Sequence, residues 1–223
     1  MIATPIGNLG DLSPRAIESL QTADLVAAED TRITGKLLTL KGIKKPFVRI
    51  DEHTDRNRLE DLVRQAASGK IIALATDAGT PGISDPGVEL VEVAYEFGVQ
   101  IDAIPGPSAV TNALALSGFF AQKYTFLGFL SKKPGSLRSE LESYLTSSMT
   151  LVFFESPHRI GKTLKAVVET LGDRRVAVCR EMTKLHQDVR RGRISEVVET
   201  NLAVKGEYTV VVEGFRRGVA RAD

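Results

Sequence analysis

The sequence predicts an α/β fold with mainly parallel strands, because short runs of strand-forming residues alternate with segments of helical periodicity. The 223 residues are enough for one large domain or two small ones. Hydrophobic residues make up 43% of the chain and charged residues 26%, which is typical of a globular protein. The predicted strands are residues 25–28, 71–75, 100–104, 151–154, 176–179 and 208–213.

Two segments between these strands carry clear signals for the start and the end of a helix. Asp85-Pro86 fits an N-cap followed by a proline at the first helical position, and Gly98 fits the helix end. Ser156-Pro157 begins the second helix in the same way, and its apolar residues recur with the helical period up to Gly172. This apolar stripe consists of Ile160, Leu164, Val167, Val168 and Leu171.

A domain boundary is predicted near residues 118–135, where the alternating pattern breaks. Aromatic residues crowd there, and Lys132-Lys133-Pro134-Gly135 follows them. We therefore expect an N-terminal α/β domain of residues 1–117 and a C-terminal α/β domain of residues 118–223. The alternative is that this stretch forms a strand and a loop inside one domain.

Loops rich in glycine and proline follow several of the predicted strands. The longest, residues 76–87, contains three glycines and two prolines, and it places Asp77 directly after a strand. Glycines let a ligand approach the backbone, and a carboxylate there could receive a polar or cationic group. Similar loops lie at residues 4–9, 105–109 and 155–159, and we expect the strand ends to converge on one crevice. The alternative for each is an ordinary rigid turn.

Several common functional motifs are missing. No two of the 19 glycines are separated by a single residue, which excludes the G-x-G motif of dinucleotide sites and Rossmann methyltransferases. The three histidines have no paired spacing and Cys179 is the single cysteine, so we expect no metal. The lone cysteine and the lack of a long apolar segment together predict a cytoplasmic protein. No G-x-S-x-G motif of a serine hydrolase is present.

Six short motifs, taken in order, resemble one known family. They are ATPIGNL at 3–9, AEDTR at 28–32, DAGTP at 77–81, PGP at 105–107, FESPHR at 154–159 and REMTK at 180–184. Together they resemble the tetrapyrrole methylase family over nearly the whole chain. The motifs at 28–32 and 154–159 resemble in particular its bacterial branch that methylates the ribose 2'-oxygen of a cytidine in 16S rRNA of the 30S ribosomal subunit.

This resemblance implies two α/β domains with S-adenosylmethionine in the cleft between them, and a homodimer. The family often carries a helical extension after this core, and we expect that extension to be missing here, because the sequence stops soon after Arg216-Arg217. The positions that match the family's cofactor pocket are Leu9, Asp77, Ala78, Gly79, Thr80, Ile83, Ser108, Ala109, Phe154, Met182 and Thr209.

Methyl transfer to a ribose hydroxyl is a direct displacement, so holding the 2'-oxygen close to the methyl group can supply much of the rate acceleration. A base that takes the hydroxyl proton, or a cation that stabilises the developing alkoxide, should add to it. The candidate catalytic groups are Glu181 and Lys184 after one strand, and Asp30 with its neighbour Glu29 after another. The sequence does not choose among them. The alternatives are an exposed Glu181–Lys184 ion pair and an Asp30–Arg32 salt bridge that shapes its loop.

The net charge of +1 hides two basic segments. Residues 31–58 contain eight basic and three acidic residues, and residues 174–193 contain seven basic and two acidic ones, so each segment has a net charge of +5. This segregation is expected if one face binds RNA, although a solvated basic surface is the alternative. The candidate RNA-binding residues are Arg32, Lys36, Arg159, Arg190 and Arg191.

Two other functions remain open at this point. A methylase of the same fold acting on a tetrapyrrole or on a translation factor would need no basic face. A non-catalytic module that binds RNA or nucleotides would not bind S-adenosylmethionine.

Overall fold

The computed structural model describes residues 1–84 and 87–216, and the chain divides into two compact units, Met1–Ser108 and Ala109–Asp223. The expected boundary after residue 117 lies at the far end of α5 (Ala109–Ser117), and this helix belongs to the second unit. Its buried residues, which include Val110 and Ala113, explain this, because α5 packs on strands of the second sheet. No helix within the described ranges is long and apolar enough to span a bilayer.

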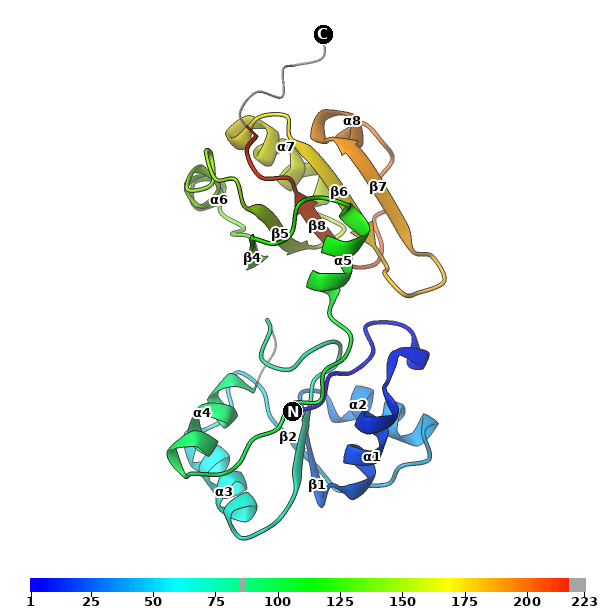
Figure 1. The fold of residues 1–223 in the computed structure, drawn as a ribbon, viewed down its shortest axis with the longest axis vertical. Coiled ribbons are helices and arrows are strands. Elements are labelled where there is room, and N and C mark those ends of the chain that lie inside the picture. Colours follow the sequence, from blue (N-terminus) through cyan, green and yellow to red (C-terminus); the bar gives the residue numbers. More distant parts are fainter. Residues whose placement is uncertain (85–86, 217–223) are drawn as a thin grey trace. The chain divides into compact units, whose positions relative to one another are not determined.

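The first unit has a parallel sheet with strand order β2-β1-β3. In Figure 1, α1 and α2 cover one face of this sheet, and α3 and α4 cover the other. The strands are β1 (Leu25–Ala28), β2 (Phe47–Arg49) and β3 (Ile72–Ala75). The helices are the 3-10 helix η1 (Leu9–Asp11), α1 (Pro14–Thr22), α2 (Thr31–Leu40), α3 (Arg56–Ala67) and α4 (Val88–Glu96).

Side-chain caps begin most helices of the first unit. The Ser13 hydroxyl accepts from the Ala16 N–H at the start of α1, where Pro14 is the first helical residue. Asp30 and Asp55 cap α2 and α3 in the same manner. The expected cap Asp85-Pro86 lies outside the described residues, and α4 begins at Val88 after Gly87.

The second unit has a five-stranded mixed sheet with strand order β4-β5-β8-β6-β7. Only the β4–β5 pair is parallel, so the expectation of mainly parallel strands is wrong for this sheet. The strands are β4 (Tyr124–Phe129), β5 (Thr150–Glu155), β6 (Arg175–Arg180), β7 (Asp188–Arg193) and β8 (Tyr208–Val212). The remaining helices are α6 (Pro134–Glu142), α7 (Ile160–Leu171) and α8 (Ile194–Val198).

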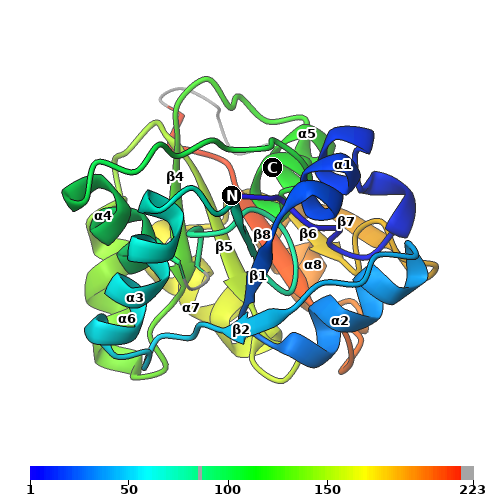
Figure 2. The same cartoon turned by 90° about the horizontal axis from the view of Figure 1, so that it is seen from below.

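Alternation along these strands separates two faces of the second sheet. Leu151 and Phe153 of β5 join the core formed with α6, α7 and α8, whereas Val152 and Phe154 point to the opposite face. In Figure 2, β5 and β8 lie side by side, as their pairing requires. The opposite face is therefore where Phe154 and its neighbours on β8 and β6 meet.

Several predicted elements need correction. Residues 100–104 form no strand, and only Ile104 makes an isolated bridge, to Ile2. Helix α7 begins at Ile160 and not at Pro157, because residues 157–159 form a turn before it, although Gly172 ends it as expected. Strands β2 and β7 were not predicted, and β4 matches the alternative of a strand within residues 118–135. In β7, three of the six residues are arginines, which masks the strand pattern.

Candidate functional site

Three loops of the first unit converge at the carboxyl ends of its strands. Thr4 and Gly79 exchange two backbone hydrogen bonds of 2.9 and 3.0 Å. The Thr80 hydroxyl donates to the Pro107 carbonyl at 3.4 Å, which joins the third loop to the other two. The expected convergence is therefore confirmed for residues 4–9, 76–84 and 105–108, whereas the loop at 155–159 belongs to the second unit.

Glycines allow the close contact of these loops. Gly79 and Gly82 have φ values of 88° and 82°, in the region that favours glycine. A Cβ on Gly106 would lie 2.9 Å from the Ala3 Cβ, so a side chain there would separate two of the loops. Ser84 has a φ of 63°, which is uncommon for a residue with a side chain and is often found at functional loops.

Two carboxyl groups lie at this edge with raised pKa values. The Asp77 Oδ1 accepts from the Asp30 N–H at 3.2 Å. Burial raises the pKa of Asp77. Burial, followed by repulsion from Asp77, also raises the pKa of Glu29. Within the described part of the chain neither group has an ion-pair partner, so this edge can accept hydrogen bonds or positive charge from a ligand.

Asp30 has a different environment from its neighbour Glu29. Its carboxylate pairs with Arg32 at 2.5 Å and accepts from the Arg32 N–H at 2.8 Å as the cap of α2. The Arg32 hydrogen bonds hold the pKa of Asp30 well below its usual value. This is the salt bridge considered as the alternative to catalysis, and such a carboxylate is a weak base.

The other first-unit positions of the expected cofactor pocket differ in exposure. Leu9, Ala78 and Ile83 are exposed, and Leu9 begins η1. Gly79 is buried between Ile6 and the Pro107 carbonyl. Ser108 is the last residue of the first unit.

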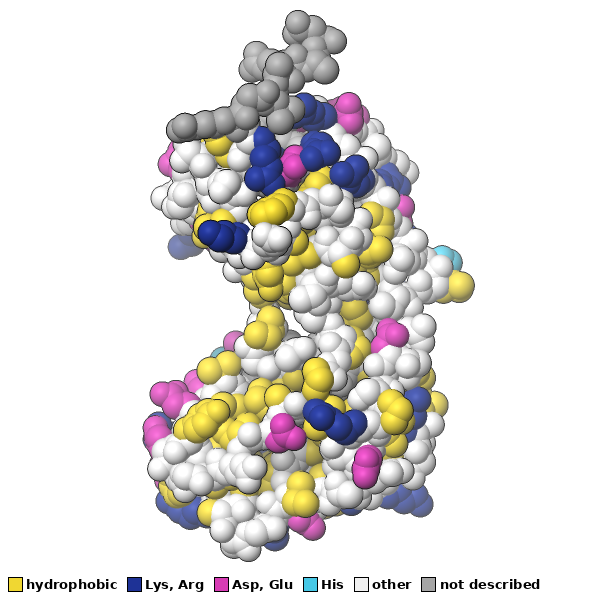
Figure 3. Space-filling model, viewed as in Figure 1, with side chains coloured by type: hydrophobic (Ala, Val, Ile, Leu, Met, Phe, Trp, Pro, Cys, Tyr) yellow, Lys and Arg dark blue, Asp and Glu magenta, His cyan; other side chains and the backbone are white. Residues whose placement is uncertain are grey.

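In the second unit, Phe154 and Thr209 are direct partners in the β5–β8 register. Thr209 is in turn the partner of Cys179 on β6, so the three residues form one row across the sheet. The Phe154 ring contacts the rings of Phe126 and Phe129, with centroids 5.0 and 5.5 Å apart. Figure 3 shows hydrophobic side chains gathered at the surface near β4 and β5. Ala109, also expected in the pocket, begins α5.

The loop after β6 has a strained backbone around a buried methionine. Glu181 and Thr183 have φ values of 48° and 67°, and Met182 between them is 6% exposed. The Glu181 carboxylate accepts from Lys184 at 2.9 Å and from the Glu207 N–H at 3.0 Å. A Cβ on Gly206 would come within 2.7 Å of the Glu181 side chain, so this glycine makes room for the carboxylate.

The charges of this loop neutralise one another. Burial would raise the pKa of Glu181, but the hydrogen bonds from Lys184 and the Glu207 N–H lower it overall. Burial would lower the pKa of Lys184, but its hydrogen bonds to Glu207 and Glu181 raise it overall. Lys184 therefore remains a cation and Glu181 an anion near neutral pH, as the ion-pair alternative requires.

The candidate RNA-binding residues fall into two groups. Arg159 donates to the Leu130 and Ser131 carbonyls, Arg190 pairs with Asp188, and Arg191 donates to the Ser117 carbonyl at 2.7 Å. These three are engaged within the second unit. Arg32 and Lys36 lie one turn apart on α2 of the first unit, and both are exposed. Arg32 also pairs with Asp30.

The sequence did not single out two buried hydroxyl groups of the first unit. The hydroxyls of Thr34, on α2, and Thr76, directly before Asp77, are buried without a hydrogen-bond partner. Their neighbours Asp30 and Asp77 were visible in the sequence, but burial depends on the packed loops and was not. No cluster of three or more potential metal ligands is found among residues 1–84 and 87–216.

The chain is similar to known methyltransferases. A family model of tetrapyrrole (corrin/porphyrin) methylases matches residues 1–198. A ribosomal RNA small subunit methyltransferase I from Thermotoga maritima is 44% identical over 216 residues, which cover 96% of this chain and 97% of that protein. The protein of the same name from Bacillus subtilis is 42% identical over 96% of this chain and 74% of its own length.

Solved structures share the fold at low identity. A cobalamin biosynthetic enzyme, cobalt precorrin-4 methyltransferase, has a TM-score of 0.67 and 17% identity, covering 95% of this chain and 93% of that one. The methyltransferase CobJ has a TM-score of 0.69 and 16% identity, covering 96% of this chain and 92% of its own.

Proposed function

The chain belongs to the tetrapyrrole methylase family, and from this premise we propose that it transfers a methyl group from S-adenosylmethionine to a ribose 2'-oxygen of a cytidine in small-subunit rRNA. The observation that carries the proposal is the 44% identity to the Thermotoga maritima rRNA methyltransferase over nearly the full length of both chains. The similarity to the corrin enzymes is far weaker and supports the fold alone.

The converging loops of the first unit fit S-adenosylmethionine chemically. Its ammonium and ribose hydroxyl groups are hydrogen-bond donors, and Asp77 and Glu29 are acceptors whose raised pKa values leave them available to such a donor. The buried Thr76 hydroxyl lacks a partner and could take one from a ligand. The bare backbone at Gly79 and Gly82 lets a ligand lie close to peptide groups.

The second unit offers an apolar surface to the same cofactor. Phe154 and Met182 carry the apolar and polarizable atoms that pack well on a purine ring. Thr209 adds one hydroxyl in the row beside Phe154. We therefore propose that residues of both units bind S-adenosylmethionine, which supplies an electrophilic methyl group on its sulfonium.

Among the candidate catalytic carboxyl groups, Glu29 is the one best suited to act as a general base. Asp30 and Glu181 are held ionised by their cationic partners, so they accept a proton poorly. Glu29 has a raised pKa and no ion-pair partner in the described ranges, which suits it to take the proton of a ribose hydroxyl. Lys184 keeps its charge and is suited to stabilise a developing alkoxide.

We propose that rRNA is held mainly by the first basic segment. Arg32 and Lys36 on α2 are exposed, and Lys44 follows the same helix and is exposed as well. Phosphate contacts of this kind hold the substrate without reading its bases. Because its substrate would be a ribosomal particle, we place the protein in the cytoplasm. The homodimer expected from the family remains a proposal, and light scattering would test it.

The proposal is tested by methyl transfer from labelled S-adenosylmethionine to 30S subunits that lack the modification. We expect one labelled cytidine per subunit. The phosphodiester that follows this cytidine should resist alkaline cleavage, because a 2'-O-methyl group blocks that reaction. Free 16S rRNA and a corrin precursor serve as parallel substrates. Label on a base atom, or transfer to the corrin and not to the subunit, would overturn the proposal.

A further inference from the structure

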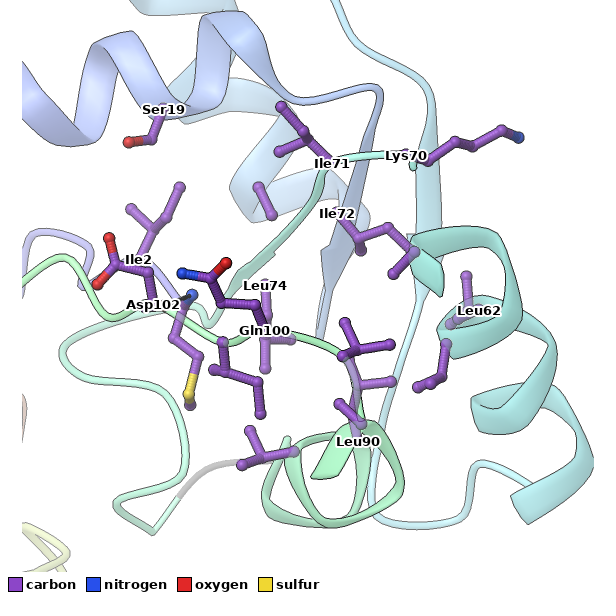
Figure 4. A pocket seen from close by; sticks show the side chains of 18 of the residues that line it. Ile2, Ser19, Leu62, Lys70, Ile71, Ile72, Leu74, Leu90, Gln100 and Asp102 are labelled. Atoms are coloured by element: carbon purple, nitrogen blue, oxygen red, sulfur yellow. Dashed lines mark hydrogen bonds between the residues drawn. The ribbon is translucent and has the colours of Figure 1, made fainter. Parts of the chain in front are cut away.

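Two cavities in the described part of the first unit differ in their lining. One, of about 400 Å³, is bounded mostly by apolar side chains of β3, α3 and α4, among them Leu62 and Leu74 in Figure 4. The other, of about 740 Å³, lies where the chain leaves β1, β2 and β3, and its lining includes several charged side chains. Ligands of α/β proteins bind at this carboxyl edge of a parallel sheet, in cavities of about 300–1,000 Å³. We call the second cavity the strand-end pocket.

The strand-end pocket combines apolar and charged side chains. Ile50 and Leu90 are buried residues in its wall, and Val88 at the start of α4 is an exposed one. Arg49 and Glu52 contribute charges, and their side chains are 67% and 82% exposed, so both are accessible to a ligand. A planar heterocyclic ring has the same division, because its faces are apolar and its edge carries hydrogen-bonding groups. The lining therefore fits a nucleobase.

Glu29 connects the strand-end pocket to the reaction proposed above. It lines the pocket, and burial, followed by repulsion from Asp77 and, more weakly, from Asp30 and Glu52, raises its pKa. Asp77 is the proposed acceptor for the cofactor, and Glu29 is the proposed base for the ribose hydroxyl. The order Asp77, Glu29, Glu52 therefore matches the order of cofactor, ribose and base in the reacting complex.

Cytosine differs from uracil in the hydrogen-bonding groups along its Watson–Crick edge. Cytosine presents one donor, the N4 amino group, beside two acceptors, N3 and O2. A carboxylate accepts from N4, and a guanidinium, whose N–H donors form a rigid fork, donates to N3 and O2 together. Uracil has an acceptor at O4 and a donor at N3, so neither group would find its partner. A carboxylate and a guanidinium side by side thus distinguish the two pyrimidines.

Arg49 is held by a carboxylate that is itself fixed. The Arg49 Nη2 pairs with the Asp51 Oδ2 at 3.1 Å. The Asp51 Oδ1 accepts from the His53 N–H at 3.1 Å and from the Thr54 hydroxyl at 3.2 Å. Within residues 1–84 and 87–216, Asp51 is the single ion-pair partner of Arg49, so the rest of the guanidinium fork is available to a ligand.

We propose that the strand-end pocket binds the cytosine ring of the target nucleotide, with Glu52 accepting from N4 and Arg49 donating to N3 and O2. This role, which rests on the function proposed above, adds the groups that select the base. Asp51 acts through Arg49 and is a positioning residue. Glu29 then faces the ribose of the same nucleotide.

The test compares methyl transfer to 30S subunits that carry cytidine or uridine at the target position, with the same labelled cofactor. The wild type should react about 10- to 100-fold faster with cytidine, and Arg49→Ala should lower this ratio about tenfold. Glu52→Gln should slow the reaction with cytidine and speed the reaction with uridine, because its amide can donate to O4 of uracil. Each ratio is measured within one variant, so it does not depend on the fraction of folded protein.

Arg58→Ala is the matched control for Arg49→Ala. Arg58 lies on α3, is exposed and is not among the described residues that line the strand-end pocket. Both substitutions remove one positive charge from the first basic segment, so both variants should share any loss of attraction for phosphates. The ratio of the cytidine and uridine rates should change in Arg49→Ala alone.

Three results would overturn this assignment. Equal transfer to both subunits by the wild type would mean that the base is not selected, while the proposed methyl transfer would stand. Unchanged ratios in Arg49→Ala and Glu52→Gln would place base selection outside the strand-end pocket. Transfer to neither subunit would overturn the proposed function, and the role of the pocket with it.

Discussion

The two units differ in whether the charged groups discussed above have ion-pair partners. In the first unit, Asp77 and Glu29 are partly buried beside each other, and their pKa values are raised. In the second unit, Glu181 and Lys184 are paired with each other and with Glu207, so that each keeps its charge. Carboxyl groups without an ion-pair partner are available to a ligand, whereas paired groups mainly hold their own loop. The first unit is thus the better place to look for proton transfer and for recognition of a charged ligand.

The largest effect that this comparison predicts is on the rate of Glu29→Gln. If Glu29 takes the proton of the ribose hydroxyl, kcat should fall by about 10²- to 10⁴-fold at pH 7. The wild-type rate should rise with pH above the ordinary Glu pKa of 4.5, as the raised pKa of Glu29 is passed, and the variant should lose this rise. Single-turnover methyl transfer to 30S subunits between pH 5 and pH 8 measures both.

Stability provides the control for Glu29. The folded state favours the protonated carboxyl, so the contribution of Glu29 to the free energy of unfolding falls as pH rises from the ordinary to the raised pKa. Glu29→Gln should therefore be at least as stable as the wild type at pH 7. Glu18→Gln, at an exposed carboxyl on α1, should leave the rate unchanged. If Glu29→Gln kept the wild-type rate, Glu29 would not be the general base.

The next largest effect is on cofactor affinity at Asp77. Asp77→Asn keeps an oxygen that can accept from the Asp30 N–H but removes the charge. Because a hydrogen bond to a charged group contributes about 1.5–3 kcal/mol, S-adenosylmethionine should bind about ten- to a hundredfold more weakly. Titration calorimetry measures this, with Asp61→Asn on the exposed face of α3 as the control. Unchanged affinity would remove Asp77 from the cofactor site.

The smallest effects separate the two basic segments. Arg191 donates to the Ser117 carbonyl, and its guanidinium lies 4.9 Å from the Phe119 ring centroid, so Arg191→Ala should lower the free energy of unfolding by about 2 kcal/mol. Lys36→Ala should change stability by less than about 0.5 kcal/mol. It should instead weaken rRNA binding and reduce the log–log salt slope by about 0.7–0.9. Denaturant unfolding and filter binding in a salt series distinguish the two, and a stability loss in Lys36→Ala would contradict the assignment.

The salt bridges explain why equal charge in the two segments predicts different roles. Arg175 and Arg216 pair with Glu213, and Arg175 and Arg191 both lie over the Phe119 ring. Figure 3 shows basic side chains gathered around an acidic one on this unit. Counting charges along the sequence cannot reveal that these arginines are held by an acid and aromatic rings brought there by folding.

Much of the candidate site was visible in the sequence because it is local. The glycines of residues 76–84 and the neighbouring Asp77 predicted a ligand loop, and the structure joins that loop to residues 4–9 and 105–108. The choice between Asp30 and Glu29 was not visible. The local Asp30–Arg32 salt bridge was one alternative that the sequence offered, but the burial that raises the pKa of Glu29 arises from packing.

The sequence by itself determined the alternation of helices and strands, the helix ends at Gly98 and Gly172, and the loops that follow β1 and β3. These features depend on backbone preferences and hydrophobic period within a few residues. Only the tertiary structure decided the antiparallel pairing around β8, the hydrogen bond from Arg191 to the Ser117 carbonyl, and the failure of residues 100–104 to form a strand. Each of these depends on a partner distant in the chain.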